Sequence, residues 1–414
     1  MNNSPQMKKG QASSPYHVLL PAGLGTCLSL FGDASLYAVL PTHTAAAGVS
    51  VASVGILLSA NRFVRLVLNG PAGVAYDRWR RRPLFVPALF VGACSTAIYG
   101  LAQGFWPLLA GRLLWGLAWA GIWVGGNTII LDITHDDTRG GWIGIYQVFF
   151  FLGASGGALL GGFLTDRLGY RPAMGIGAAL TLIGSLIALM FLPETRGLRP
   201  EAAGAVASRR GSTLGSNPSS GAALLAVIAL YGINRLVVAG VFQSTFGLFL
   251  LKQLGDQVQI GGRPVGVATL TGSALGLSTL IAMASAPVLG SLSDRLGNRW
   301  RAAAVGLLPG VAGFALLAIG APLTILVGIP LTAITSGSNQ GLSTALIGDF
   351  GGVGRQSRRL GVLFTAGDLA SAVGPLLAYA LIPLLEIEGI YLLNAGAFAA
   401  IFLVSVWRSV RPRA

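Results

Sequence analysis

Residues 73–83 read GVAYDRWRRRP: a glycine, an aspartate four positions later, and then a run of arginines. Long apolar stretches flank this charged segment, over 51–76 on one side and 84–103 on the other. A helix needs about 20 apolar residues to cross about 30 Å of hydrocarbon, and both stretches are long enough. The sequence therefore predicts two membrane-spanning helices joined by a short basic connection.

The charged segment occurs twice in the chain. GVAYDR at 73–78 returns as GSLSDR at 290–295, an offset of 217 residues. The same offset relates Asp132 to Asp349 and Gly157 to Gly374. Landmarks that keep one register over so long a distance indicate two parallel halves, related by an axis along the membrane normal.

Composition extends this interpretation to all 414 residues. Only 10% of them are charged and 53% are apolar, so lipid must surround most of the surface. We expect an all-α membrane protein with twelve transmembrane helices in two six-helix bundles related by pseudo-two-fold symmetry. The bundles are predicted over 1–193 and 221–414, with a cytoplasmic linker over 194–220. The expected spans are 17–40, 51–76, 84–103, 107–131, 141–164, 172–193, 221–251, 265–290, 302–320, 322–347, 361–384 and 389–407.

Positive charges gather on one side of these spans. Outside the spans, 20 Lys and Arg residues fall on the side shared by both termini, and four fall on the other. The positive-inside rule then predicts a multi-pass protein of the cell membrane with both termini in the cytoplasm. The net charge of +14 comes from these short clusters, so nucleic-acid binding is not expected. The expected partners are the lipid bilayer, a small-molecule substrate and protons, and the protein is expected to be a monomer.

The repeated segment resembles the loop between helices 2 and 3 of the major facilitator superfamily, which carries G-x-x-x-D-R-x-G-R-[RK]. Arg80 replaces the second glycine of that pattern, and Asn298 replaces an arginine in the second copy. The resemblance covers essentially the whole chain and implies a cytoplasmic latch that closes in the outward-facing state. The latch and gating residues that it implies are Gly73, Asp77, Arg78, Arg81, Asp132, Gly290, Asp294 and Arg295.

The fifth expected span is rich in glycines at regular spacing. The pattern resembles the signature of the superfamily's drug-proton antiporters, although Ala158 stands where that signature has proline. The alternative interpretation is a packing face, because small residues let membrane helices approach closely. The glycines are Gly144, Gly153, Gly157, Gly161 and Gly162.

Six charged residues lie within the expected spans, where ionisable groups are costly and mark functional sites. At a rise of 1.5 Å per residue, Asp33 and Arg112 differ in depth by about 3 Å, and Arg65 and Asp368 by about 6 Å. Each pair is either a structural salt bridge or part of proton coupling. We expect Asp33 to carry the proton, with Asp368 as the second candidate. Leu108, Arg112 and Gly116 resemble the superfamily's L-x-x-x-R-x-x-Q-G pattern, with Trp115 in place of the glutamine. In that family the arginine is linked to proton transfer.

Other polar residues in the spans are candidates for a substrate cavity, since their side chains offer hydrogen bonds within the membrane. The candidates are Tyr37, Asn61, Arg62, Arg65, Gln147, Asn234, Arg235, Gln243, Asn339 and Gln340. Two functions stay open. The first is proton-coupled efflux of small amphipathic or drug-like molecules by alternating access. The alternative is an organic-anion carrier, because four arginines against two aspartates leave the spans formally positive.

An enzyme is not expected. GASG at 153–156 matches the G-x-S-G of intramembrane serine proteases, but that chemistry needs a base beside the serine. The three histidines, His17, His43 and His135, fall at the ends of spans or in loops. No metal-binding, phosphate-binding or dinucleotide motif is present, so no cofactor and no metal is expected.

Overall fold

The computed structural model describes residues 15–135, 138–197, 219–349 and 356–410. In its first half, six long helices follow one another, and a four-residue helix, α2 (Thr44–Ala47), lies in the first connection. The long helices are α1 (Tyr16–Val39), α3 (Val51–Arg78), α4 (Arg82–Leu101), α5 (Phe105–Asp132), α6 (Arg139–Leu168) and α7 (Tyr170–Phe191).

The second half begins with one long span in three parts: α8 (Ser219–Asn234), the π-helical segment η2 (Arg235–Phe242) and α9 (Gln243–Leu254). A two-stranded antiparallel hairpin follows, formed by β1 (Gln257–Ile260) and β2 (Arg263–Gly266). The remaining helices are α10 (Val267–Leu296), α11 (Arg299–Ile319), α12 (Pro322–Asp349) and α13 (Gln356–Val410).

These helices account for the twelve expected spans. Ten helices of the described chain are long and apolar enough to cross a membrane. One of the ten is α13, which is two helices joined at Glu386, where φ is 57°. The twelfth span is α12, whose 28 residues give a length of about 42 Å but include many Thr, Ser and Gly residues. The prediction of an all-α membrane protein is therefore confirmed.

Polar caps and glycines set several helix ends. The Asn298 side chain accepts hydrogen bonds from Trp300 N (3.0 Å) and Arg301 N (3.3 Å), which caps α11. Capping thus gives a local reason for an asparagine at the position where the family pattern has arginine. Gly169 separates α6 from α7 at φ 91°, a conformation that favours glycine.

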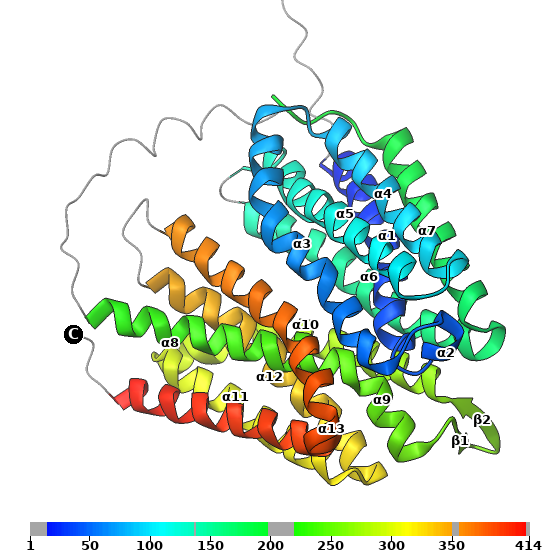
Figure 1. Cartoon of the computed structure of the whole chain (residues 1–414). Helices are drawn as coiled ribbons and strands as arrows, with labels where there is room; N and C mark the ends of the chain where they lie inside the picture. Colours follow the sequence, from blue (N-terminus) through cyan, green and yellow to red (C-terminus); the bar gives the residue numbers. More distant parts are fainter. Residues whose placement is uncertain (1–14, 136–137, 198–218, 350–355, 411–414) are drawn as a thin grey trace, which may run out of the picture.

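The helices form two groups, α1 to α7 and α8 to α13, which lie beside each other in Figure 1. The main contacts between the groups are α6 with α10 and α3 with α13. The offset of 217 residues carries α3 onto α10 and α6 onto the first part of α13. Each cross-bundle contact is therefore the symmetry mate of the other, as a pseudo-two-fold axis between the bundles requires.

The bundles meet at the end of the molecule that carries the β1–β2 hairpin, which we call the hairpin face. There a Cβ added at Gly162 would lie 2.0 Å from Ala268 O, and one added at Gly55 would lie 2.8 Å from Pro375 O. The opposite end, which we call the arginine-rich face, carries the α3–α4 connection. The two groups of helices diverge toward that face in Figure 1.

Candidate functional site

An ion pair joins α1 to α5 in the interior of the first bundle. Arg112 has no exposed surface, and its Nη1 donates a hydrogen bond to Asp33 Oδ1. Its Nε donates to Leu57 O (3.0 Å) and its Nη2 to the Tyr37 hydroxyl (3.2 Å). The structure thus brings together the two charges that were predicted at similar depth.

Tyr37 connects this ion pair to the second bundle. It lies one helical turn after Asp33 on α1, and its hydroxyl donates to Leu58 O (3.1 Å). The same hydroxyl accepts hydrogen bonds from Arg112 and from Arg62 Nε (3.1 Å). The tyrosine therefore uses its single donor and both acceptor positions, and it places two guanidinium groups on one oxygen.

Arg62 reaches from the first bundle into the second. Its Nη1 donates to Ser371 O on α13 (2.6 Å), and its Nη2 approaches Gln243 Oε1 on α9 at 3.4 Å. The side chain is buried, with 6% of the residue surface exposed. An unbroken series of contacts therefore runs from Asp33 through Arg112, Tyr37 and Arg62 to the opposing bundle.

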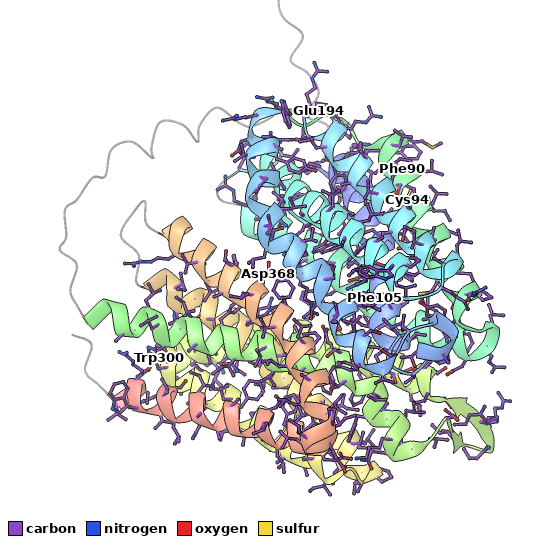
Figure 2. All side chains as sticks on the ribbon, viewed as in Figure 1. Phe90, Cys94, Phe105, Glu194, Trp300 and Asp368 are labelled. Carbon is purple, nitrogen blue, oxygen red and sulfur yellow. The ribbon has the colours of Figure 1, made fainter. Side chains whose placement is uncertain are left out.

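A second ion pair crosses between the bundles. Arg65 Nη2 on α3 lies 3.1 Å from Asp368 Oδ1 on α13, and both side chains are 17% exposed. Asn69, one turn after Arg65, donates to Asp368 Oδ2 at 3.3 Å. Figure 2 places Asp368 where α3 of the first bundle faces α13 of the second. The pair predicted between these helices is formed.

Arg235 stands at the start of the π-helical segment of the seventh span. It is half-buried, and its Nε is a buried atom with no hydrogen-bond partner among the described residues. Its positive charge is close enough to repel that of Arg62, which the charge of Arg65 also repels. Single turns of π-helix often mark functional positions in helices.

The other predicted cavity residues divide into two kinds. Asn234 donates to Ser336 O (3.1 Å), and Asn339 donates to Thr335 O (3.1 Å) and Gly306 O (3.4 Å). These two asparagines are buried and join helices within the second bundle. Asn61 is buried, Gln147 and Gln243 are half-buried, and Gln340 is exposed.

The glycines of α6 permit close packing on two neighbours. Cβ atoms added at Gly153, Gly157 or Gly161 would lie within 2.8 Å of α1 atoms, and one at Gly162 would strike α10. A Cβ at Gly144 would meet no atom of the described chain within 4 Å. Four of the five glycines therefore keep α6 against α1 and α10, whereas Gly144 is exposed and has no such role among the described residues.

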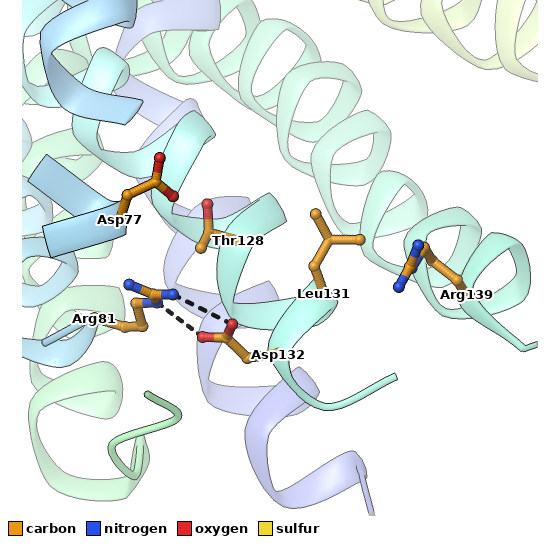
Figure 3. Close-up of a pocket in the computed structure, with 6 residues that line it drawn as sticks. All are labelled: Asp77, Arg81, Thr128, Leu131, Asp132 and Arg139. Atoms are coloured by element: carbon orange, nitrogen blue, oxygen red, sulfur yellow. Dashed lines mark hydrogen bonds and ion pairs between the residues drawn. The ribbon is translucent and has the colours of Figure 1, made fainter. Parts of the chain in front are cut away.

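The arginine-rich face carries the predicted latch residues. Arg81 binds Asp132 through two nitrogens, at 2.8 and 3.4 Å. They line a pocket of about 190 Å³ together with Asp77, Thr128, Leu131 and Arg139 (Figure 3). Gly73 and Gly290 meet no described atom within 4 Å of an added Cβ, and Arg78, Asp294 and Arg295 are exposed. The Asp349 side chain lies outside the described residues.

Sequence reasoning missed Glu194, which follows α7. Its carboxylate accepts hydrogen bonds from the backbone N–H groups of Arg81 (2.8 Å), Arg82 (3.2 Å), Thr195 (3.1 Å) and Arg196 (3.0 Å). Burial raises the pKa of this carboxyl, but the four backbone donors outweigh burial and lower the pKa. Glu194 thus anchors the start of α4 beside the Arg81–Asp132 pair.

Sequence reasoning also missed Asp166, at the hairpin face. Its Oδ2 accepts a hydrogen bond from Thr269 N (2.7 Å), in the first turn of α10. It lies close enough to His43 to raise the pKa of that imidazole, although burial has the larger effect and lowers it. An acid near the end of α6 therefore caps a helix of the opposite bundle and closes this face.

The family model of the Major Facilitator Superfamily matches residues 22–273 and 236–414, which together cover nearly the whole chain. This chain belongs to the Major Facilitator Superfamily. The resemblance drawn from the two charged segments and the glycine spacing is thus confirmed at the level of the family. The proteins similar to this transporter are themselves membrane transporters rather than enzymes.

Similar proteins of known name include tetracycline and multidrug resistance proteins. The class E tetracycline resistance protein of Escherichia coli is 26% identical over 333 residues, covering 78% of this chain and 76% of its own. The multidrug resistance protein MdtG of Citrobacter koseri is 23% identical and covers 95% of both chains. A bacterial homologue of the human lysosomal transporter Spinster, solved in an inward-facing and unoccupied conformation, has a TM-score of 0.73 at 18% identity over 96% of both chains.

Proposed function

We propose that this transporter exports small amphipathic or drug-like molecules in exchange for protons, by alternating access between its two bundles. The names of the similar tetracycline and multidrug resistance proteins support export of such compounds. The observation that carries the proton coupling is the continuous series Asp33–Arg112–Tyr37–Arg62, which ends on Ser371 and Gln243 of the other bundle.

Protonation of Asp33 provides the link between proton binding and movement. A neutral carboxyl no longer balances the charge of Arg112, so the guanidinium loses its main attraction within the first bundle. Arg112 and Arg62 share the Tyr37 hydroxyl, and a shift of one changes the hydrogen bonds of the other. A proton on Asp33 thereby biases the contacts that Arg62 makes across the bundle boundary.

In the described conformation, the two bundles are in contact at the hairpin face and are separated at the arginine-rich face. We assign the arginine-rich face, and both termini, to the cytoplasm on the positive-inside rule. The structure then corresponds to an inward-facing state of a monomeric transporter. In the outward-facing state, the segments around Gly73 and Gly290 approach each other and the contacts around Gly162 separate. The boundary between bundles falls within 194–220, most of which lies outside the described residues.

Transport by the purified full chain in lipid vesicles tests this function. Tetracycline is supplied on the side of the arginine-rich face, and a pH gradient is imposed with the opposite side acidic. We expect accumulation across the membrane together with movement of protons toward the tetracycline side, both abolished when a protonophore collapses the gradient. Protein-free vesicles and the exposed-arginine variant Arg171→Gln serve as controls. Equal tetracycline flux with and without the gradient contradicts proton coupling, and the absence of flux for a panel of amphipathic compounds contradicts export.

A further inference from the structure

Three arginines approach one another at the boundary between the bundles. Arg62 and Arg65 lie three residues apart on one face of α3. Arg235 approaches from the seventh span of the second bundle, where its Cγ would lie 3.1 Å from a Cβ added at Gly367, the residue before Asp368. Among the described residues of this cluster, Asp368 is the carboxylate that forms an ion pair, and it pairs with Arg65. The cluster therefore carries two positive charges in excess, inside a membrane protein where such an excess is costly.

The hydrogen bonds of the three guanidinium groups are unequal. Arg62 donates to Tyr37, Ser371 and Gln243. By contrast, Arg65 Nε and Arg235 Nε are both buried, and neither has an acceptor among the described residues. Buried donors are nearly always satisfied in folded proteins, and the exceptions call for a functional reason. These two nitrogens belong to the same charged cluster, and an anionic oxygen would satisfy both the charge and the hydrogen bonds.

An exposed aromatic side chain, Phe364, lies beside the charges and packs on a buried one, Tyr231. Tyr231 packs against Gly367, where an added Cβ would come within 2.1 Å of its ring. Tyr231 also forms an edge contact with Phe364, with ring centroids 6.0 Å apart. Phe364 is 47% exposed and lies one turn before Asp368, on the same face of α13. A molecule with its charged group on the arginines finds an apolar surface within one helical turn.

We propose that the exported molecule carries an anionic group, such as a carboxylate, sulfonate or phosphate, which Arg65 and Arg235 bind while its apolar body lies along Phe364. This inference rests on the proposed export function and narrows its substrate class. Guanidinium groups bind such oxyanions through paired, charge-assisted hydrogen bonds. Because Asp368 already occupies one nitrogen of Arg65, the substrate anion competes with Asp368 for that arginine.

Equilibrium binding to the purified full chain in detergent tests the proposal without any gradient. The probes are naphthalene-2-sulfonate and 2-naphthylmethylammonium, which share an aromatic body and differ in the sign of their charge. Titration calorimetry measures both probes on the wild type and on Arg235→Gln, Arg235→Lys and Asp368→Asn, with Arg171→Gln as the matched exposed-arginine control. Thermal unfolding of each variant shows that it is folded.

We expect the sulfonate to bind the wild type more tightly than the ammonium does. Loss of a hydrogen bond between charged groups predicts at least about tenfold weaker sulfonate binding in Arg235→Gln. Arg235→Lys retains part of the affinity, and Asp368→Asn strengthens sulfonate binding because it frees Arg65. A merely structural role for Asp368 does not produce that gain.

Three outcomes overturn the proposal: tighter binding of the ammonium, an unchanged sulfonate Kd in Arg235→Gln, or a site that binds added chloride and excludes the sulfonate. Because no gradient is present, these outcomes are independent of proton coupling. Proton-driven tetracycline flux with no preference for the sulfonate would refute this inference and leave the export function intact. Sulfonate binding without any proton-driven flux would support the anion site and refute the proposed proton-coupled export.

Discussion

Replacing Asp33 with asparagine isolates the ion pair that we place at the centre of coupling. The change preserves the size of the side chain and removes the negative charge beside Arg112, which is fully buried. Breaking a buried pair by removing one partner typically costs about 3–5 kcal/mol. Because Asp33 is 16% exposed and the amide oxygen still accepts a hydrogen bond, we expect a loss of about 2–3 kcal/mol of stability.

A double-mutant cycle separates the charge effect from other consequences of the substitution. In the Asp33→Asn/Arg112→Gln variant both charges are absent, so no unpaired ion remains in the interior. We therefore expect the double variant to unfold at a higher temperature than either single variant. Thermal unfolding of the full chain in detergent, followed by near-ultraviolet absorbance or intrinsic fluorescence, gives the comparison.

Transport in lipid vesicles tests whether the Asp33–Arg112 pair is needed for proton coupling. Both Asp33→Asn and the double variant should lose pH-driven accumulation, while exchange of labelled substrate at equal pH persists because it needs no proton. Asp368→Asn is the matched comparison, since its side chain is 17% exposed and also pairs with an arginine. If Asp33→Asn retains pH-driven accumulation, or if Asp368→Asn alone loses it, the assignment of the proton to Asp33 is wrong. An Asp33→Asn protein as stable as the wild type would refute the energetic argument.

Three further predictions concern the two faces of the molecule. Gly162→Ala places a Cβ 2.0 Å from a carbonyl oxygen of α10, so closure of the hairpin face is blocked and turnover falls at least about tenfold. Gly175→Ala, whose Cβ meets no described atom within 4 Å, should transport normally; similar rates for the two variants would rule out this packing role. Arg81→Lys loses the two-nitrogen contact with Asp132 and should slow transport without changing substrate Kd, whereas a changed Kd would contradict a gating role. Because the pKa of Glu194 is lowered in the folded state, its carboxylate stabilises the fold at pH values above the ordinary pKa of a glutamate, and this stabilisation is lost as the pH falls through the folded-state pKa. Glu194→Gln should therefore reduce the fall of the unfolding temperature with pH on the acid side. The same pH dependence in the variant and the wild type would contradict this role for Glu194.

The sequence predicts the spans and the repeat well because hydrophobic length and register are local properties of the chain. The depth argument also finds the pairs of Asp33 with Arg112 and of Arg65 with Asp368. In the second pair, a depth difference of about 6 Å still permits a contact of 3.1 Å, because a long arginine side chain covers the remaining distance.

The features that sequence reasoning missed depend on distant parts of the chain. Glu194 and Asp166 are acids near helix ends, and in sequence they look like ordinary solvated charges. Two of the four backbone N–H groups that bind Glu194 lie 113 and 112 residues away in the chain, and the one that binds Asp166 lies 103 residues away. The π-helical segment from Arg235 to Phe242 has no periodicity of its own, and the hairpin over 257–266 is too short to give a strand pattern.

The internal repeat includes the residues that pack the two bundles together but not the charged residues within the spans. The offset of 217 residues preserves the cross-bundle contacts, the charged loops and some of the glycines at which helices approach, such as Gly55 with Gly272 and Gly157 with Gly374. It preserves none of the charges within the spans: Asp33, Arg62, Arg65, Arg112, Arg235 and Asp368 correspond to Leu250, Thr279, Ala282, Ile329, Val18 and Phe151. A rocking motion between two equivalent arrangements needs only the repeated parts, since each bundle offers the other the same surface. A proton or an anion, however, must favour one arrangement over the other by its difference in binding free energy, and identical sites in both halves would make that difference small. The unrepeated charges are therefore the residues to which we assign the proposed coupling to a proton and to an anion.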